Sequence, residues 1–365
     1  MLVVSAMNAF KGALGSIGAS ECVAKGLQDS QVETLVFPLA DGGDGTLEVF
    51  RYLMMGDLVA VHVHDPFGRI IGANYLRMGD TAIMESAKAS GLALLKGERL
   101  DPLKASSFGT GELMSDAIEK GASRIILGIG GSATNDGGLG LLIGLGAKAK
   151  GTTERGGRGL LQIEDIDISV PLEKLEGRSL VIAADVLNPL TGPKGATMVY
   201  GPQKGVTSDL AIQFEPAMSR WRNLLEQKTA EAIGDRQGSG AAGGMGAAAI
   251  AIGGQVRLGA EIVLELARFD EKASRADGLV TGEGRLDGQT SFGKAPLIVA
   301  KAFKGIGGRR VIGLAGELGN GYEMLRPPFD AFFSIAQGPI SLEESMASTA
   351  VLLQKAAIEI GRIIS

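Results

Sequence analysis

Short β-branched runs alternate with amphipathic helical patterns along most of this chain, which indicates parallel βαβ units. Ser341 and Glu344 have the spacing of a capping box, and the apolar residues after them recur at helical intervals. They predict one last helix that runs to residue 364. Short apolar runs predict strands at residues 2–5, 34–37, 124–129, 180–184, 278–281, 310–315 and 331–335. The alternation predicts an α/β fold.

The stretch between residues 59 and 93 has a different pattern. Its strand-like runs are separated by the turn sequences Asp65-Pro66-Phe67-Gly68 and Met78-Gly79-Asp80, which favour antiparallel hairpins. The α/β pattern of the first part of the chain resumes after residue 264. We therefore predict a discontinuous domain of residues 1–60 plus 265–365, with residues 61–264 inserted as a second α/β domain. The length of 365 residues also favours two cores over one.

Composition excludes several classes of partner. Lys and Arg total 36 against 41 for Asp and Glu, a net charge of −5, so the clustered positive charge that nucleic acids or anionic lipids require is not expected. No apolar run approaches the ~18 residues of a membrane span, and the start of the chain lacks a cationic leader. The single cysteine suits a reducing compartment. We predict a cytoplasmic protein with a small-molecule substrate; assembly into homodimers stays open.

Glycine is abundant, with 56 residues, and its densest stretch follows the third predicted strand. Gly130, Gly131 and Ser132 lie there, where main-chain N–H groups at a strand's carboxyl end can face phosphate oxygens. Asn135 and Asp136 add oxygen atoms that could orient Mg²⁺ or a ribose. We predict a phosphate cradle. The alternative is a tight turn in which Asn135 and Asp136 cap the next helix.

Two other segments have the composition of anion sites. Ser107 and Thr110 open a predicted helix, where hydroxyls and free N–H groups gather at the positive helix end; simple N-capping is the alternative. Gly243 and Gly244 precede a run of small residues, for which close helix packing is the alternative. The charged, glycine-rich segment 152–159 reads as a surface loop without a chemical role.

Phosphoryl transfer needs a metal ion, positive charge and a proton acceptor. Charged residues in glycine-rich loops or at strand ends could bind the metal and supply the charge and the acceptor. Asp185 ends a buried strand, where a carboxylate is costly unless it has a role or a partner, and it is our candidate base. An internal salt bridge is the alternative for the acid and the guanidinium between residues 282 and 287. The candidates are Asp41, Asp185, Glu283, Arg285, Lys11, Lys204 and Lys294.

Two familiar nucleotide motifs match only in part. Gly128-x-Gly130-x-x-Ala133 has the spacing of a dinucleotide fingerprint but lacks the later strand-ending acid, and it supports a nicotinamide oxidoreductase as an alternative. Residues 288–295 match a P-loop until Ala295, which has no hydroxyl for Mg²⁺. His62 and His64 share one strand face, but no third metal ligand is evident, so two exposed histidines are the simpler interpretation.

Several longer strings resemble the bacterial glycerate kinases that phosphorylate the 2-hydroxyl of glycerate, the glycerate kinase type 1 family. They are in family order and span nearly the whole chain. They include Phe10-Lys11-Gly12, Asp41-Gly42-Gly43-Asp44-Gly45-Thr46, Gly130-Gly131-Ser132-Ala133-Thr134-Asn135-Asp136-Gly137-Gly138 and Thr281-Gly282-Glu283-Gly284-Arg285. The resemblance implies ATP with Mg²⁺ as donor, D-glycerate as acceptor, 2-phosphoglycerate as product, and a flavodoxin-like domain with an inserted α/β domain around a cleft.

These observations assign each candidate residue a hypothetical role. We expect catalysis from Asp185, Lys204 and Arg285, and substrate contacts from Lys11, Ser107 and Thr110. The expected metal ligands are Asp41 and Asp136. The expected nucleotide-binding residues are Gly130, Gly131, Ser132, Asn135, Gly243, Gly244, Glu283 and Lys294.

The chain departs from the family pattern at a few polar positions. The family usually has an acid and a hydroxyl where Asn8 and Ala9 stand, and a threonine where Leu187 stands. The loss of these polar groups leaves open a second alternative, a catalytically impaired protein that binds a nucleotide or a metabolite. Glycerate phosphorylation is the first hypothesis, ahead of that silent binder and of the oxidoreductase.

Overall fold

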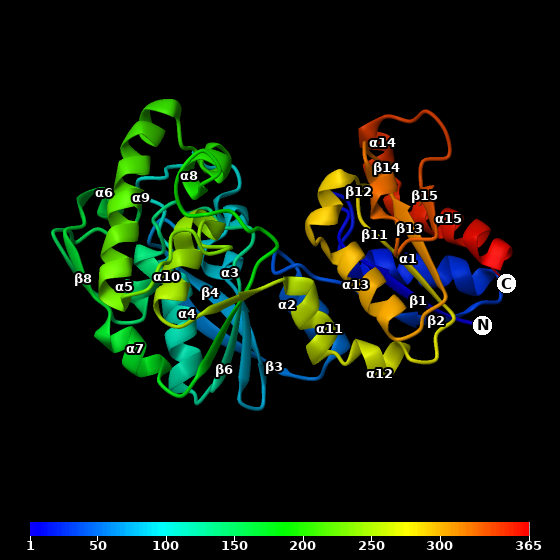
Figure 1. Cartoon of the computed structure of the whole chain (residues 1–365), viewed down its shortest axis with the longest axis horizontal. Coiled ribbons are helices and arrows are strands. Elements are labelled where there is room, and N and C mark those ends of the chain that lie inside the picture. The colour runs from blue at the N-terminus through cyan, green and yellow to red at the C-terminus, as the bar shows by residue number, and fades with distance from the viewer. Residues whose placement is uncertain (365) are drawn as a thin grey trace. The chain divides into compact units, whose positions relative to one another are not determined.

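The computed structural model describes residues 1–364, which form two compact units (Figure 1). Unit 1 contains Met1–Asp41, Glu48–Met54 and Leu258–Ser365, and unit 2 contains Gly42–Leu47 and Met55–Arg257. The helix α2 (Thr46–Leu53) carries residues of both. The division of the sequence into a domain of residues 1–60 plus 265–365 and an inserted domain of residues 61–264 stays a prediction. Within residues 1–364, no helix has the length and hydropathy that crossing a lipid bilayer demands.

Unit 1 is built on a five-stranded parallel sheet. Its order is β15-β13-β11-β1-β2, so the strands follow the order 2-1-3-4-5 of flavodoxin-like sheets when they are numbered along the chain. The α/β fold class and the parallel sheet predicted from sequence are confirmed. The strands are β1 (Leu2–Met7), β2 (Glu33–Val36), β11 (Gly278–Gly282), β13 (Arg310–Ala315) and β15 (Ala331–Ser334), with a short pair β12 (Arg285–Leu286) and β14 (Glu317–Leu318).

The side chains of β1 alternate between the two faces of this sheet. On one face the Ser5 hydroxyl donates to the carbonyl of Ser20 in α1, at 2.7 Å. Helices α1 and α15 pack closely there, because a Cβ on Gly26 would lie 2.3 Å from the carbonyl oxygen of Gln354. The helices of unit 1 are α1 (Ser16–Asp29), α11 (Gly259–Leu266), α12 (Phe269–Ala273), α13 (Ala295–Gly305), α14 (Leu342–Ala347) and α15 (Thr349–Ile364), with short η4 (Gly288–Phe292) and η5 (Tyr322–Leu325).

The prediction of one continuous last helix up to residue 364 was wrong, because the structure has two helices there, α14 and α15. The capping box is present, since the Ser341 hydroxyl accepts from the Glu344 N–H at 3.2 Å and the Glu344 carboxylate accepts from the Ser341 N–H at 3.0 Å. The helix stops at Ser348, next to which the Thr349 hydroxyl donates to the carbonyls of Ser345 and Met346. Such side-chain bonds compete with the helical ladder. In addition, α14 buries no residue, whereas α15 packs against the core.

Unit 2 contains a six-stranded mixed sheet with the order β10-β9-β6-β5-β4-β3. The two turns found in the sequence form the β3–β4 and β4–β5 hairpins, and those pairs are antiparallel. However, β5 also pairs with β6 in parallel, so the carboxyl ends of β5, β6, β9 and β10 meet at one edge. The strands are β3 (Asp57–His64), β4 (Ile70–Met78), β5 (Thr81–Glu85), β6 (Arg124–Gly128), β9 (Ser179–Ala183) and β10 (Gln255–Arg257), with a separate pair β7 (Lys148–Lys150) and β8 (Asp165–Asp167).

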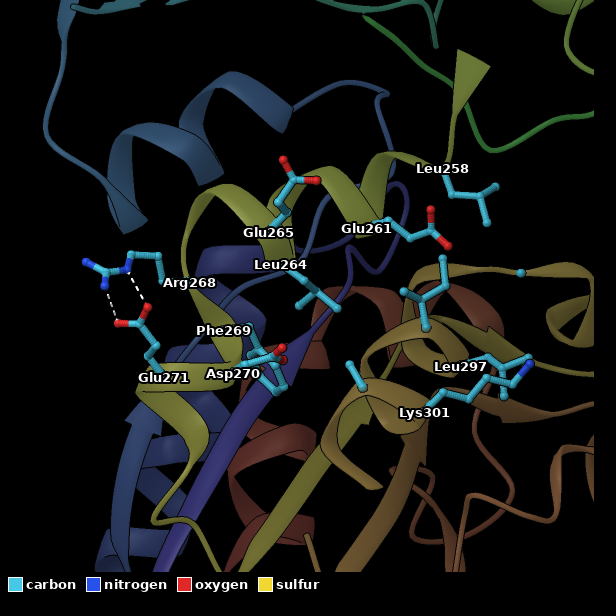
Figure 2. A pocket seen from close by; sticks show the side chains of 13 residues that line it. Leu258, Glu261, Leu264, Glu265, Arg268, Phe269, Asp270, Glu271, Leu297 and Lys301 are labelled. Carbon is cyan, nitrogen blue, oxygen red and sulfur yellow. Dashed lines mark hydrogen bonds and ion pairs between the residues drawn. The ribbon is translucent and has the colours of Figure 1, made fainter. Parts of the chain in front are cut away.

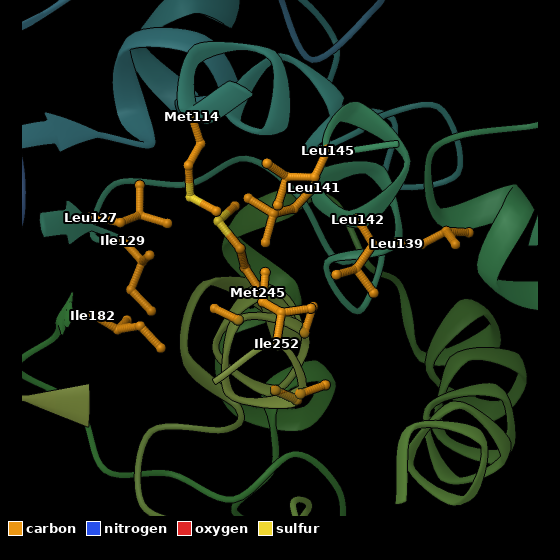
Figure 3. Close-up of a cluster of buried hydrophobic side chains, with 14 of the residues drawn as sticks. Met114, Leu127, Ile129, Leu139, Leu141, Leu142, Leu145, Ile182, Met245 and Ile252 are labelled. Atoms are coloured by element: carbon orange, nitrogen blue, oxygen red, sulfur yellow. The ribbon is translucent and has the colours of Figure 1, made fainter. Parts of the chain in front are cut away.

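Helices cover this sheet through a large apolar core. Figure 3 shows Leu141 of α5, Leu145 just after that helix, and Met245 of α10 close to Leu127 and Ile182 of the sheet. Residues 157–159 of the predicted surface loop are the start of α6, so the loop is shorter than predicted. The helices of unit 2 are α3 (Ala87–Ser90), α4 (Phe108–Glu119), α5 (Leu139–Gly144), α6 (Gly157–Gln162), α7 (Ser169–Leu175), α8 (Ala196–Tyr200), α9 (Ser208–Thr229) and α10 (Met245–Ala251), with short η1 (Leu92–Leu95), η2 (Pro202–Lys204) and η3 (Ala241–Gly244).

Candidate active site

The glycine-rich loop after β6 exposes only its first residues. Gly131 is exposed and Gly130 half-buried, whereas residues 132–140 are buried. The N–H of Gly130 already donates to the carbonyl of Gly42 at 3.0 Å, and a Cβ on Gly130 would lie 2.5 Å from the Cα of Gly43. Gly131 has a φ of 71°, which a side chain would strain. The main chain of this loop is therefore accessible at Gly131, and a phosphate cradle formed by the loop stays a prediction.

Lys204 is buried beneath this loop, with 3% of its surface exposed. Its ammonium donates to the Ser132 hydroxyl and to the Thr134 carbonyl, both at 2.8 Å. Burial lowers the pKa of Lys204 to about 7, although the charge of Asp136 opposes this shift. The structure thus brings together Lys204 and Ser132, which sequence analysis had placed in separate roles.

Asp136 is fully buried, and its carboxylate accepts four hydrogen bonds. The donors are the N–H and hydroxyl of Ser107, at 2.8 and 2.7 Å, and the N–H groups of Gly138 and Gly140, at 3.1 and 3.3 Å. Burial raises the pKa of Asp136, and these donors oppose the shift. The Ser107 hydroxyl also accepts from the Leu141 N–H at 2.9 Å. Asp136 and Ser107 therefore tie the starts of α4 and α5 together.

Thr110 and Asn135 are likewise buried among protein groups. The Thr110 hydroxyl forms a 2.8 Å hydrogen bond with the Ser90 hydroxyl. The Asn135 amide donates to the Thr197 hydroxyl at 3.2 Å, while its carbonyl oxygen is buried and has no partner among residues 1–364. Neither side chain is exposed to a ligand in this conformation.

Gly243 and Gly244 pack against the loop after β6. The N–H of Gly137 donates to the carbonyl of Gly243 at 2.9 Å, and a Cβ on Gly244 would lie 2.7 Å from the Cα of Gly137. A Cβ on Gly243 would lie 2.0 Å from the carbonyl oxygen of Thr134. The geometry is that of close packing, the alternative considered for this segment. A nucleotide contact for either glycine stays a prediction.

The Gly243→Ala variant should be destabilised by more than ~2 kcal/mol, because Gly243 combines a φ of 68° with the collision at Thr134. Gly253 is the matched control: its φ is 91° and no atom lies within 4 Å of the Cβ position, so Gly253→Ala adds strain without a collision. Urea denaturation of both variants measures the difference. Equal losses would show that the packing of the two loops is not tight.

Two further acids lie near the carboxyl edge of the unit 2 sheet. Asp185 is exposed just after β9, and its charge adds to burial in raising the pKa of Tyr200. Glu85 ends β5 and is buried, and its carboxylate accepts from the Leu47 N–H at 2.6 Å. We had not selected Glu85 as a site residue, although the signal that selected Asp185, an acid ending an apolar strand, is also present in Met84-Glu85.

In unit 1, Glu283 follows β11 and is 8% exposed. Lys294 approaches its Oε1 at 3.4 Å, and the Asn8 amide donates to its Oε2 at 3.4 Å. Burial raises the pKa of Glu283 and the charge of Asp41 adds to this, while Lys294 and Asn8 oppose it. Sequence analysis had selected Asp41, Glu283 and Lys294, and the structure places all three in one cluster.

Arg285 and Lys11 lie outside that cluster of contacts. The guanidinium of Arg285 is half-exposed and pairs with Asp287 at 3.1 Å and with Glu317 at 3.5 Å. These contacts correspond to the internal salt bridge that we had considered. Lys11 is exposed in the turn after β1.

Unit 1 also has a hollow of about 630 Å³ between α11, α12 and α13. In Figure 2, Leu258, Leu264 and Leu297 lie along it, and Arg268 pairs with Glu271 at one end. It includes none of the predicted site residues. Among residues 1–364, no three His, Cys, Asp or Glu side chains cluster as a metal site would.

Comparison with known proteins gives this arrangement a family. The family model described as "Glycerate kinase family" matches residues 3–365. The chain belongs to the glycerate kinase family. A glycerate kinase of Halalkalibacterium halodurans is 39% identical over 373 residues, covering 100% of this chain and 98% of the relative. A glycerate 2-kinase of Escherichia coli is 37% identical over 355 residues, covering 94% of this chain and 93% of the relative.

The fold agrees with that membership. The crystal structure of a glycerate kinase 2 from Salmonella typhimurium LT2 matches with a TM-score of 0.85 and 37% identity, and the match covers 100% of this chain and 98% of that one. The resemblance drawn from the sequence motifs is therefore confirmed. This member of the glycerate kinase family is an enzyme of the kinase class.

Proposed function

We propose that this protein transfers the γ-phosphoryl group of MgATP to the 2-hydroxyl of D-glycerate, and that it releases 2-phosphoglycerate and ADP. Full-length membership in the glycerate kinase family supports the reaction class, and the Escherichia coli relative named a glycerate 2-kinase supports the position of transfer. The observation that carries the proposal is the exposed Gly131 at a strand end, on a loop that buried Lys204 holds from below.

The residues present fit a nucleotide phosphate. Gly131 exposes the main chain in a conformation that suits glycine, beside the Asp44 carboxylate, whose Oδ1 lies 2.7 Å from the position of a Cβ on Gly131. Lys204 contacts the loop through Ser132 and Thr134, so we propose that it fixes the loop and adds positive charge beneath it. For Asp136 we propose a positioning role in place of metal ligation, because protein donors surround its carboxylate.

The residues also fit Mg²⁺. This ion takes oxygen ligands and is usually held by one or two carboxylates together with substrate phosphates. Asp41 and Glu283 supply such carboxylates, and the buried Oε1 of Glu283 has the Lys294 ammonium 3.4 Å away, a contact that a bound cation would have to replace. When bound, the ion neutralises charge on the phosphates. Lys294 and Asn8 hold the Glu283 carboxylate in place.

The remaining roles concern the acceptor. We propose that Asp185, exposed at the end of β9, takes the proton of the 2-hydroxyl. Lys11 and Arg285 supply positive charge for the glycerate carboxylate and for the migrating phosphoryl group. To contact that group, Arg285 must release its ion pairs with Asp287 and Glu317. Ser107 and Thr110 are buried, so they would contact substrate only after α4 shifts at its start. The predicted cleft, the cytoplasmic location and the oligomeric state stay predictions.

A coupled assay of ADP release tests the proposal against its alternatives. With Mg²⁺, ATP and D-glycerate, we expect turnover that stops when the acceptor or the metal is omitted. Binding of ATP without turnover on any hydroxy acid would favour the silent binder that Asn8, Ala9 and Leu187 suggest. Tight binding of NADH without binding of ATP would favour the oxidoreductase. A glycerate kinase relative run alongside controls for the assay.

A further inference from the structure

A small hollow in unit 2 has no lining residue from the loop after β6. We call it the hairpin pocket, because the β3–β4 turn forms one wall, and the start of α4 and residues 153–156 form the others. Its volume is about 230 Å³, below the ~300–1,000 Å³ of pockets for drug-sized ligands, so it suits a small ion or a three-carbon compound. The lining residues used below are His64, Phe67, Lys104, Ser106, Phe108 and Arg155.

Two cations line the hairpin pocket, and aromatic rings hold both. The Lys104 ammonium lies 4.9 Å from the centre of the Phe67 ring, and the Arg155 guanidinium lies 3.9 Å from the centre of the Phe108 ring. Such contacts orient a cation without neutralising its charge. Neither cation forms an ion pair with a carboxylate in the part of the chain that the structure describes.

The acids of the pocket are mostly compensated. Asp65 is buried and accepts from the N–H groups of Phe67 and Arg69, at 2.8 and 2.9 Å, and from the Arg69 guanidinium. His64 shares its Nδ1 with Glu112 at 2.9 Å. Glu154 is exposed and is the one lining acid without such a contact among the described residues. Two unpaired cations against one exposed acid leave positive charge for a ligand.

The wall that carries Arg155 is fixed in place. The buried Ser106 hydroxyl donates to the Arg155 carbonyl at 2.7 Å, and the N–H of Phe108 donates to the same hydroxyl at 3.2 Å. The segment that looked like a plain surface loop is therefore tied to the start of α4. This anchoring presents the Arg155 head group in a defined position.

We propose that the hairpin pocket binds a small oxyanion, a carboxylate or a phosphate group, between Lys104 and Arg155. Guanidinium and ammonium groups form charge-assisted hydrogen bonds with both kinds of oxyanion. This site goes beyond the proposed phosphoryl transfer, because none of the residues selected for that reaction lines it. Its occupancy is measurable without turnover.

The two histidines of the chain provide the test. His64 lines the pocket, whereas the exposed His62 lies on the same strand and does not line it. NMR of histidine-labelled, full-length protein at constant pH and ionic strength follows both rings during titration with inorganic phosphate, and separately with D-glycerate. We expect the His64 signal to shift saturably and the His62 signal to stay unchanged. The ligand that binds more tightly tells whether phosphate or carboxylate is preferred.

Variants make the result specific to the two cations. Lys104→Met with Arg155→Met should weaken the apparent affinity at least tenfold, which corresponds to ~1.4 kcal/mol. Arg158→Met, an exposed arginine of the same segment outside the pocket, should leave it within twofold. An unmoved His64 signal with both ligands would overturn the proposal. So would a double variant that folds, as its other NMR signals report, and binds as tightly as wild type.

Discussion

The Asp136→Ala variant should lose ~3–5 kcal/mol of unfolding free energy. The substitution removes the acceptor of four hydrogen bonds and leaves the donors on Ser107, Gly138 and Gly140 buried without a partner. It also leaves a cavity where α4 and α5 begin. Because the same network fixes the loop after β6, the folded fraction of the variant should bind ATP more weakly. Urea denaturation and ATP titration measure the two effects.

An exposed acid provides the comparison for that experiment. Glu173 lies on the surface of α7, and Glu173→Ala should change stability by less than ~0.5 kcal/mol. A loss of similar size in both variants would contradict the structural role of Asp136. If Asp136 were instead a metal ligand, Asp136→Ala would raise the Mg²⁺ concentration needed for half-maximal activity while the fold kept its stability.

Lys204→Met should lower activity about hundredfold and should change how stability depends on pH. Burial lowers the pKa of Lys204 to about 7 in the folded protein, whereas the unfolded chain keeps a value near 10.5. Between those values the unfolded state binds a proton that the folded state does not, so the wild type gains stability as the pH rises. From pH 7 to pH 9 this gain is ~2 kcal/mol. The variant lacks this gain.

The measurement is the difference in unfolding free energy between wild type and Lys204→Met at the two pH values. This difference should move in favour of the wild type as the pH rises. Lys96→Met, which changes an exposed lysine of the same unit, should show no such dependence. A pH-independent difference would mean that Lys204 keeps its ordinary pKa in the folded protein. Unchanged turnover in Lys204→Met would contradict its role under the loop.

Local patterns were sufficient for most of the fold. Strand 310–315 agrees with β13 at both ends, strand 124–129 is one residue longer than β6, and strand 180–184 is shifted by one residue from β9. Each is a buried parallel strand whose apolar run is unmistakable. The break at Ser348 was missed because the apolar spacing continues across it; the competing hydroxyl bonds of Thr349 become visible only in three dimensions.

The sequence predicted which loops carry polar residues and glycines at strand ends, but not which of those residues are exposed. Loop glycines and strand-end acids indicated the carboxyl edges of both sheets, where the structure places Gly131, Asp185 and Glu283. Burial then separates residues that look alike in sequence. Gly131 is exposed, whereas Asp136, a few residues later, is surrounded by protein donors. No local pattern reports which member of a polar string faces inward, because tertiary packing decides it.

The product of the reaction tests the central claim most directly. Proton-coupled ³¹P NMR of a mixture of purified protein, Mg²⁺, ATP and D-glycerate should show a new phosphate monoester signal, split into a doublet by the single hydrogen at C2, as ADP appears. A triplet from a CH₂ group would place the phosphoryl group on the 3-hydroxyl and contradict the assigned position. ATP that stays intact, while a glycerate kinase relative consumes it in a parallel sample, would contradict the proposed activity.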